Sequence, residues 1–167
     1  MPLARMHDNT RPDKRARAAR GRDAIALLKA EHRQVETWFA QFEDTESAPE
    51  KQKLATQICQ AIRLHTQIED EVFYPACRDA GISEDMMDEA DVEHDMVRKL
   101  VAEVEAGKPG DDHWEARVKV LSELVEHHVK EEEQRDGIFA AAKKADMDLI
   151  SLAQRMAARK SELAKQN

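Results

Sequence analysis

Four segments of the chain show the helical period in their apolar residues, and each interrupts its apolar face with a histidine. The stretch "HTQIEDE" at residues 65–71 shows the difficulty most clearly. His65 and Glu69 lie one turn apart on the face that also carries Ile58 and Val72. Because burying an unpartnered imidazole or carboxylate costs free energy, the fold must bring compensating groups to these side chains.

The helical segments are long and their connections are short. We expect helices at about 22–44, 48–79, 84–106 and 113–144, followed by a shorter amphipathic helix at about 147–163. The composition agrees, with only five glycines and five prolines beside abundant Ala, Leu, Glu, Lys and Arg. The sequence therefore predicts an all-α fold, an antiparallel up-down-up-down four-helix bundle with an additional C-terminal helix.

Charge is spread unevenly along the chain. Residues 1–22 hold seven Arg and Lys against two Asp, a net charge of +5; the whole chain carries −8, which leaves −13 for the rest. We expect a disordered basic arm at 1–22, the bundle at 23–144 and the C-terminal amphipathic helix at 145–167. The acidic body disfavours nucleic acid as a partner.

Two features bear on location. The start of the chain has no apolar run typical of a secretory signal, and no stretch of about 18 apolar residues would span a membrane. Cys59 and Cys77 are 18 residues apart on one expected helix, about 27 Å, which is too far for a disulfide. We therefore expect a soluble cytoplasmic protein in which both cysteines are packing residues.

One histidine on each long segment lies on the buried face, and two of these are followed one turn later by a glutamate. At 1.5 Å per residue, their distances from the connecting loops place all four within about one turn of the same level. In "HHVKEEE" the face defined by Trp114 and Leu121 selects the second His-x3-Glu pair and leaves Glu131 and Glu133 solvated. The inward polar residues are therefore His32, His65, Glu69, His94, His128 and Glu132.

Six polar groups in a dry core favour a metal site over a purely apolar packing role. Imidazole and carboxylate suit iron, zinc, copper or manganese, and the lack of thiolates argues against a closed structural zinc site. The number of ligands suits two metal ions, with bridging carboxylates and a bridging oxygen leaving about two positions open for an exogenous ligand. The alternative is a metal-free core in which the histidines and glutamates hydrogen-bond one another.

Four motifs, "LLKAEHRQV", "LHTQIEDEVFYP", "VEHDMV" and "HHVKEEE", resemble the haemerythrin-like, or HHE cation-binding, domain over about residues 23–142. The resemblance implies a four-helix bundle around a non-haem di-iron centre. Its two iron ions would be joined by an oxo or hydroxo bridge and by the carboxylates of Glu69 and Glu132. The implied ligands are the six inward residues, His32, His65, Glu69, His94, His128 and Glu132.

The chain departs from oxygen-carrying haemerythrins at two positions. Those proteins have a further histidine where this chain has Arg98, and an aspartate where it has Glu133. We therefore expect one iron to be less nitrogen-rich and more open. The resemblance then implies binding of, or reaction with, oxygen, peroxide or nitric oxide, in stress response or iron handling, with an electron donor that the sequence does not identify.

A regulatory role is the alternative. In it, the metal or oxygen state orders the bundle, and a protein partner reads that state through the basic arm or the C-terminal helix, without catalytic turnover. Glu36, one turn after His32, is a spare candidate ligand. Tyr74 is expected to point away from the buried stripe and receives no chemical role.

Overall fold

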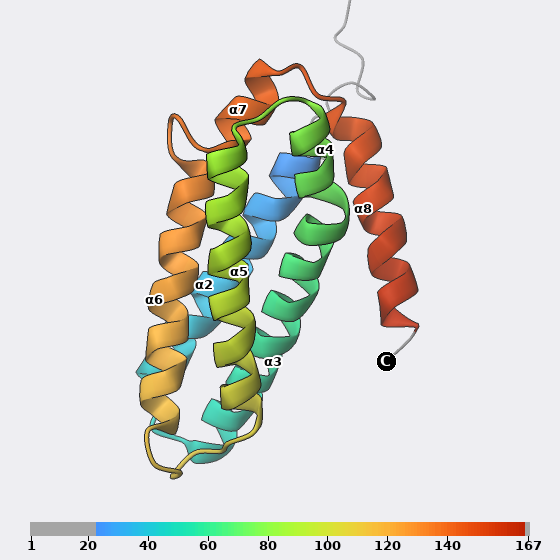
Figure 1. Ribbon diagram of the computed structural model, residues 1–167. Coiled ribbons are helices and arrows are strands. Elements are labelled where there is room, and N and C mark those ends of the chain that lie inside the picture. The colour runs from blue at the N-terminus through green and yellow to red at the C-terminus, as the bar shows by residue number, and fades with distance from the viewer. Residues whose placement is uncertain (1–22, 166–167) are drawn as a thin grey trace, which may run out of the picture.

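The computed structural model describes residues 23–165, and this part of the chain is helical and contains no strand (Figure 1). The prediction of an all-α fold is confirmed. The predicted basic arm at 1–22 lies outside the described residues. The elements are α2 (Ala24–Asp44), α3 (Ala48–Ile68), the π-helix η1 (Glu69–Phe73), α4 (Tyr74–Asp79), α5 (Glu84–Glu105), α6 (Trp114–Glu133), α7 (Ile138–Lys144) and α8 (Leu149–Ala164). None of these helices is long and apolar enough to cross a membrane.

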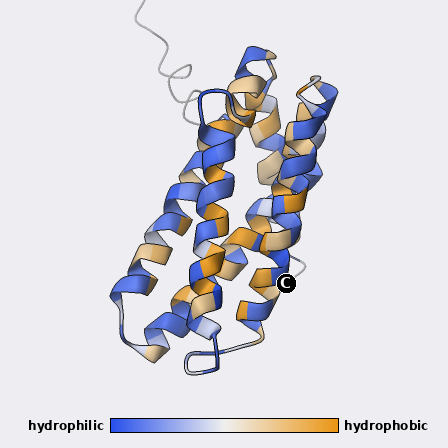
Figure 2. Ribbon diagram, turned by 60° about the vertical axis from the view of Figure 1, so that its left-hand side comes forward, coloured by the Kyte–Doolittle hydropathy of each residue, from blue (hydrophilic) through white to orange (hydrophobic). Residues whose placement is uncertain are grey.

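The four long helices α2, α3, α5 and α6 lie side by side (Figure 1). α2 packs on α3 and α6, while α5 packs on α3 and α6. Hydrophilic and hydrophobic residues alternate along each long helix (Figure 2), and most hydrophobic positions are buried; Val92 and Met96 of α5 and Val120 of α6 are exposed. α8 lies outside this group and packs on α2, α3 and η1.

The buried apolar residues form two separate cores, and the inward polar residues lie between them. One core joins the first turns of α2 to η1, α4, α7 and α8, with Leu28, Phe73 and Phe139 among its members. The other joins the opposite ends of the long helices around Phe42 and Trp114. Buried apolar side chains therefore border the polar layer on both sides.

Helix starts follow simple capping rules. The Asp23 carboxylate accepts a hydrogen bond from the backbone N–H of Ala26, 2.8 Å away, and opens α2. Ser47 caps α3, with a proline in the first turn. Asp148 caps α8 in the same way. These caps set where each helix starts, and hence the depth at which its histidine or contact residue lies.

The second long helix is not regular throughout, because the π-helix η1 interrupts it between Ile68 and Tyr74. The N–H of Tyr74 donates to the carbonyl of Glu69, five residues back. Pro75 follows and has no N–H for the carbonyl of Glu71, which favours this wider turn. The extra residue rotates the following side chains, so Tyr74 is fully buried. The prediction that Tyr74 points away from the stripe is wrong for this reason.

The fourth long helix is shorter than predicted. α6 ends at Glu133 and α7 starts at Ile138, whereas the sequence suggested one helix to 144. Gly137 passes so close to the end of α6 that a Cβ there would lie 2.3 Å from the Glu131 carbonyl oxygen. This turn brings Phe139 over the ring of His32, with centroids 5.9 Å apart and planes 8° from parallel.

Gly137→Ala tests this close approach. The φ of Gly137 is −77°, which alanine adopts freely, so the only penalty is the clash with the carbonyl oxygens of Glu131 and Glu132. We expect the free energy of unfolding to fall by about 1–3 kcal/mol, measured by guanidinium denaturation. Asp136→Ala, in the same connection but exposed, is the matched control. Equal stability of the two variants would contradict the packing described.

Candidate metal centre

Four histidines meet at the polar layer, one each from α2, α3, α5 and α6. The Nε2 atoms of His32 and His65 are 3.0 Å apart, and those of His94 and His128 are 3.1 Å apart. All four histidines are buried. The four helices therefore aim one ring nitrogen each at a common centre.

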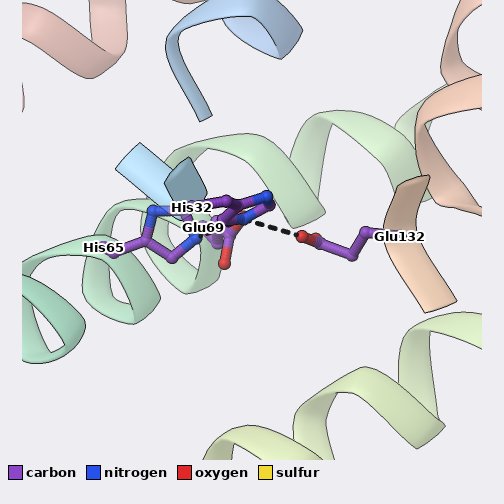
Figure 3. Close-up of side chains that lie close together, drawn as sticks. All are labelled: His32, His65, Glu69 and Glu132. Carbon is purple, nitrogen blue, oxygen red and sulfur yellow. Dashed lines mark hydrogen bonds and ion pairs between the residues drawn. The ribbon is translucent and has the colours of Figure 1, made fainter. Parts of the chain in front are cut away.

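Two glutamates lie between these histidine pairs. Glu69 places Oε1 3.2 Å from Nε2 of His65 and Oε2 3.3 Å from Nε2 of His94. Glu132 reaches in from α6, with Oε2 3.3 Å from Nε2 of His32 (Figure 3). The same oxygen lies 3.7 Å from Nε2 of His128. Each carboxylate thus contacts both pairs, as a bridging ligand must.

Three carboxylate oxygens in this layer have no hydrogen-bond partner within the described residues: both oxygens of Glu69 and Oε2 of Glu132. Both side chains are completely buried, and the groups nearest these oxygens are imidazole nitrogens at 3.2–3.3 Å, so protons or cations at the centre must compensate the two buried charges. Two donors about 2.1 Å from one cation are about 3.0 Å apart at an octahedral edge and about 3.4 Å at a tetrahedral one. The observed separations of 3.0–3.3 Å match that range. The donor set therefore fits metal cations.

The donor atoms divide into two groups that share Glu69, and within each group all lie within 4.8 Å of one another. One group contains His32, His65, Glu69 and Glu132, and the other contains Glu69, His94 and His128. The structure thus brings together all six residues selected from the sequence. Their role as ligands stays a prediction. Glu36 is not among them, because its carboxylate pairs with Arg33 on a half-exposed surface.

Each histidine is held from outside by a second carboxylate that accepts a hydrogen bond from Nδ1–H. This bond fixes the ring and turns the Nε2 lone pair toward the centre. The pairs are His32 with Glu133 at 2.7 Å, His65 with Glu31 at 2.8 Å, His94 with Asp70 at 2.6 Å and His128 with Glu93 at 2.6 Å. The site is therefore orientated for cation binding at all four imidazoles.

These outer carboxylates follow a pattern that the sequence contains but that periodicity alone does not reveal. Each is adjacent in the sequence to one inward residue and accepts a hydrogen bond from a histidine on a different helix. Glu31, for example, is next to His32 on α2 and accepts from His65 on α3. A residue next to an inward one lies about 100° around the helix, on the flank that faces the adjacent helix. The prediction that Glu133 is solvated is wrong for this reason, since it lies between α6 and α2.

Tyr74 lies at the candidate centre, which the sequence interpretation missed. Its hydroxyl donates to Oε1 of Glu132 at 2.8 Å and lies 3.4 Å and 3.3 Å from Nε2 of His94 and His128. Burial, with the nearby charge of Glu132, raises the pKa of Tyr74 well above its usual range, so the phenol stays a proton donor. It satisfies one oxygen of Glu132 and leaves the other facing the histidines.

A small cavity borders the histidines on the side away from Tyr74. Its volume is about 30 Å³, and apolar side chains of Val35, Ile62, Val97 and Val125 contribute much of its wall. All four candidate histidines line it as well. A space of this size holds a molecule no larger than about one or two water molecules. The cavity therefore has room for a small ligand beside the histidines.

Without a cation the layer retains protons. Burial alone would lower the pKa of His65, but the charge of Glu69 and the hydrogen bond to Glu31 raise it to about 10. Burial alone would also lower the pKa of His94, but Asp70 and Glu69 outweigh this effect and raise it to about 9. The pKa of Glu69 is correspondingly far below its usual range, because the protonated histidines outweigh its burial. Metal binding must therefore displace protons.

Comparisons with known proteins define the class of this helical metal-binding domain. The model of the hemerythrin HHE cation binding domain matches residues 23–137, and the chain belongs to this family. A hemerythrin HHE cation binding domain-containing protein from Mycobacterium kansasii has the same fold, with a TM-score of 0.69 and 23% identity. That alignment covers 84% of this chain and 86% of the other.

A DNA nickase from Nostoc sp. is 26% identical over 115 residues. The match covers 69% of this chain and only 32% of the nickase, so this chain spans about a third of that relative's length. Family and geometry agree on a centre that holds metal cations.

Glu132→Gln and Glu131→Gln form a matched pair that tests the register on α6. Glu132 is completely buried among the donors, while Glu131 is a partly exposed neighbour whose carboxylate accepts from Gln134. We expect Glu132→Gln to lower metal content per chain by at least half, because a bridging carboxylate is lost, and Glu131→Gln to leave it unchanged. Metal analysis after dialysis measures both. The reverse order would show that the first His-x3-Glu register is the functional one.

The histidine pKa values predict opposite pH dependences for the two forms of the protein. Raised histidine pKa values stabilise the metal-free fold below the unfolded value of 6.5, and this stability is lost as pH rises toward 9–10. The metal-bound form needs neutral imidazoles, so its extra stability grows over the same window. Melting temperatures between pH 6.5 and 9, with and without chelator, measure both slopes. Parallel slopes would contradict the assignment.

Proposed function

We propose that the protein is a non-haem di-iron protein that binds or reacts with oxygen, peroxide or nitric oxide, in stress response or iron handling. One observation carries the proposal: Glu69 divides its two oxygens between His65 and His94 while neither oxygen has a hydrogen-bond partner in the described chain. A carboxylate shared in this way joins two donor groups into one centre, which supports two metal ions rather than one.

The kinds of donor support iron. All candidate ligand atoms are imidazole nitrogens or carboxylate oxygens, a set that suits iron among the first-row metals. The two cysteines are buried in the apolar cores, Cys59 in one and Cys77 in the other, and neither belongs to the two donor groups. When bound by these histidines and glutamates, two irons would supply the redox and ligand-binding chemistry, and an external donor would supply electrons.

The surrounding residues support a small ligand. The valine- and isoleucine-lined cavity beside the histidines has a volume of about 30 Å³, which suits a diatomic molecule or peroxide. On the opposite side Tyr74 presents a hydroxyl that donates to Glu132. Phe73 and Phe139 are buried on that side, with ring centroids 5.7 Å apart. The chain thus excludes bulk water and keeps a proton donor next to a bridging carboxylate.

The proposal includes an architecture and a setting. We take residues 23–144 as an antiparallel up-down-up-down bundle to which the C-terminal segment at 145–167, with its helix α8, is added; the short connections and the pairing of long helices support this. Buried, unpaired cysteines support a cytoplasmic location. We do not extend the DNA nicking named for the Nostoc relative to this chain, because two thirds of that protein are unmatched and the charge outside residues 1–22 is −13.

A metal-responsive regulatory bundle is the second candidate. It is favoured by the contact between α8 and the carboxylate that holds His65, because that contact links the centre to a helix on the outside of the bundle. In this case chelation should increase hydrogen exchange in α8 and alter partner binding, with no steady-state turnover of peroxide or oxygen. Steady turnover with a reductant would favour the catalytic proposal.

Metal content and the optical spectrum of aerobically purified protein test the proposal first. We expect about two irons per chain and a near-ultraviolet band that dithionite bleaches. His65→Ala should leave about one iron or fewer, because it removes a donor from the larger group. A folded protein that is purified without metal and does not bind added ferrous iron would refute the proposal. The alternative, a metal-free core of hydrogen-bonded histidines and glutamates, would then hold. Two irons in His65→Ala would refute the ligand assignment.

A further inference from the structure

The C-terminal helix α8 contacts the metal centre through one side chain. Lys160 of α8 forms an ion pair with Oε1 of Glu31, and Oε2 of the same carboxylate accepts from Nδ1 of His65 at 2.8 Å. Nε2 of His65 then faces His32 and Glu69. A continuous path therefore runs from the outside of the bundle to the donor group that contains Glu132.

The residues that match the family model end at 137, so α8 and Lys160 lie beyond them. We propose that Lys160 is a positioning residue of the metal centre, which holds Glu31 so that His65 keeps its Nε2 directed at the metal position it shares with His32. This inference rests on the proposed metal centre and adds to it a requirement for α8.

The geometry explains why a cation is needed at this place. Glu31 is 30% exposed, so without a second partner its carboxylate is free to turn toward water and lose the hydrogen bond to His65. Lys160 is similarly covered, at 28% exposure, and occupies the oxygen that His65 does not use. Each oxygen of Glu31 then has one partner, which leaves one side-chain conformation. The effect is on orientation, since an ion pair this exposed contributes little energy by itself.

The other donor group has a corresponding cation. Arg98 pairs with Asp70, whose other oxygen accepts from Nδ1 of His94. Arg98 belongs to α5, one of the four long helices, whereas Lys160 comes from α8. The contacts of Lys160 lead through Glu31 to His65, and those of Arg98 lead through Asp70 to His94. The structure therefore assigns each of these two basic side chains to a different metal position. Removing one should leave the other position intact.

Zn²⁺ binding to the metal-free, full-length chain tests the inference, since zinc accepts the same donors and undergoes no redox change. Affinities come from competition with a chelating dye, and ring nitrogen NMR of His65 and His94 shows which position is filled. We expect Lys160→Met to weaken one of the two positions about tenfold, the one that contains His65, and Lys160→Arg to restore it. Arg98→Met should weaken the position that contains His94 instead.

Two variants on the same helix separate the role of Lys160 from docking of α8. Arg159→Met removes the ion pair with Glu71 but not the contact with Glu31, and Arg155 is exposed and has no ion pair within residues 23–165. Both Arg159→Met and Arg155→Met should bind Zn²⁺ as the wild type does. Weakening of the His65 position by Arg159→Met to the same extent as by Lys160→Met would overturn the inference.

A double-mutant cycle makes the path itself testable. Glu31→Gln should weaken the His65 position, and Lys160→Met should then have no further effect in that background, because the residue it acts through is gone. An equal loss in both backgrounds would overturn the inference, as would wild-type affinity in Lys160→Met. Failure of the wild-type chain to bind Zn²⁺ at either position would instead overturn the proposed metal centre.

Discussion

The structure depends on how six buried polar side chains are compensated between two apolar cores. Four imidazoles and two carboxylates are buried there. Outside the layer, each imidazole donates Nδ1–H to its own carboxylate. Inside it, three carboxylate oxygens have only imidazole nitrogens near them. Protons on His65 and His94 neutralise part of this charge, and cations at the shared centre replace those protons when the site is loaded.

The outer carboxylates make the positions of the helices interdependent. Each is adjacent in the sequence to an inward residue of its own element and accepts a hydrogen bond from a histidine of another element. Glu93, for example, is next to His94 on α5 and accepts from His128 of α6. A slip of one residue along either helix rotates its side chains by about 100° and breaks both kinds of contact at once. The polar layer therefore fixes the register of the helices as well as the geometry of the donors. Apolar packing specifies this register less strictly.

Two irregular segments shape the chemistry on one side of the centre. The π-helix Glu69–Phe73 keeps Glu69 inward and also turns Tyr74 inward, so one segment supplies both a shared carboxylate and a proton donor to the other carboxylate. The turn before α7, made possible by Gly137, places Phe139 against His32. Beyond it α8 returns along the bundle and brings Lys160 to Glu31. Departures from regular helices thus complete the surroundings of the donors.

The sequence by itself determined the helical class and the six inward residues, because both follow from a period of 3.6 residues within single helices. It also contained a sign of the irregularity at Tyr74, in the missing N–H of Pro75. Only the tertiary structure decided the rest. Glu31, Asp70, Glu93 and Glu133 act across helix interfaces, so their partners depend on which helices are neighbours and at what depth. Lys160 is 129 residues from Glu31 in the chain, and no local period relates the two; packing of α8 on α2 brings them together.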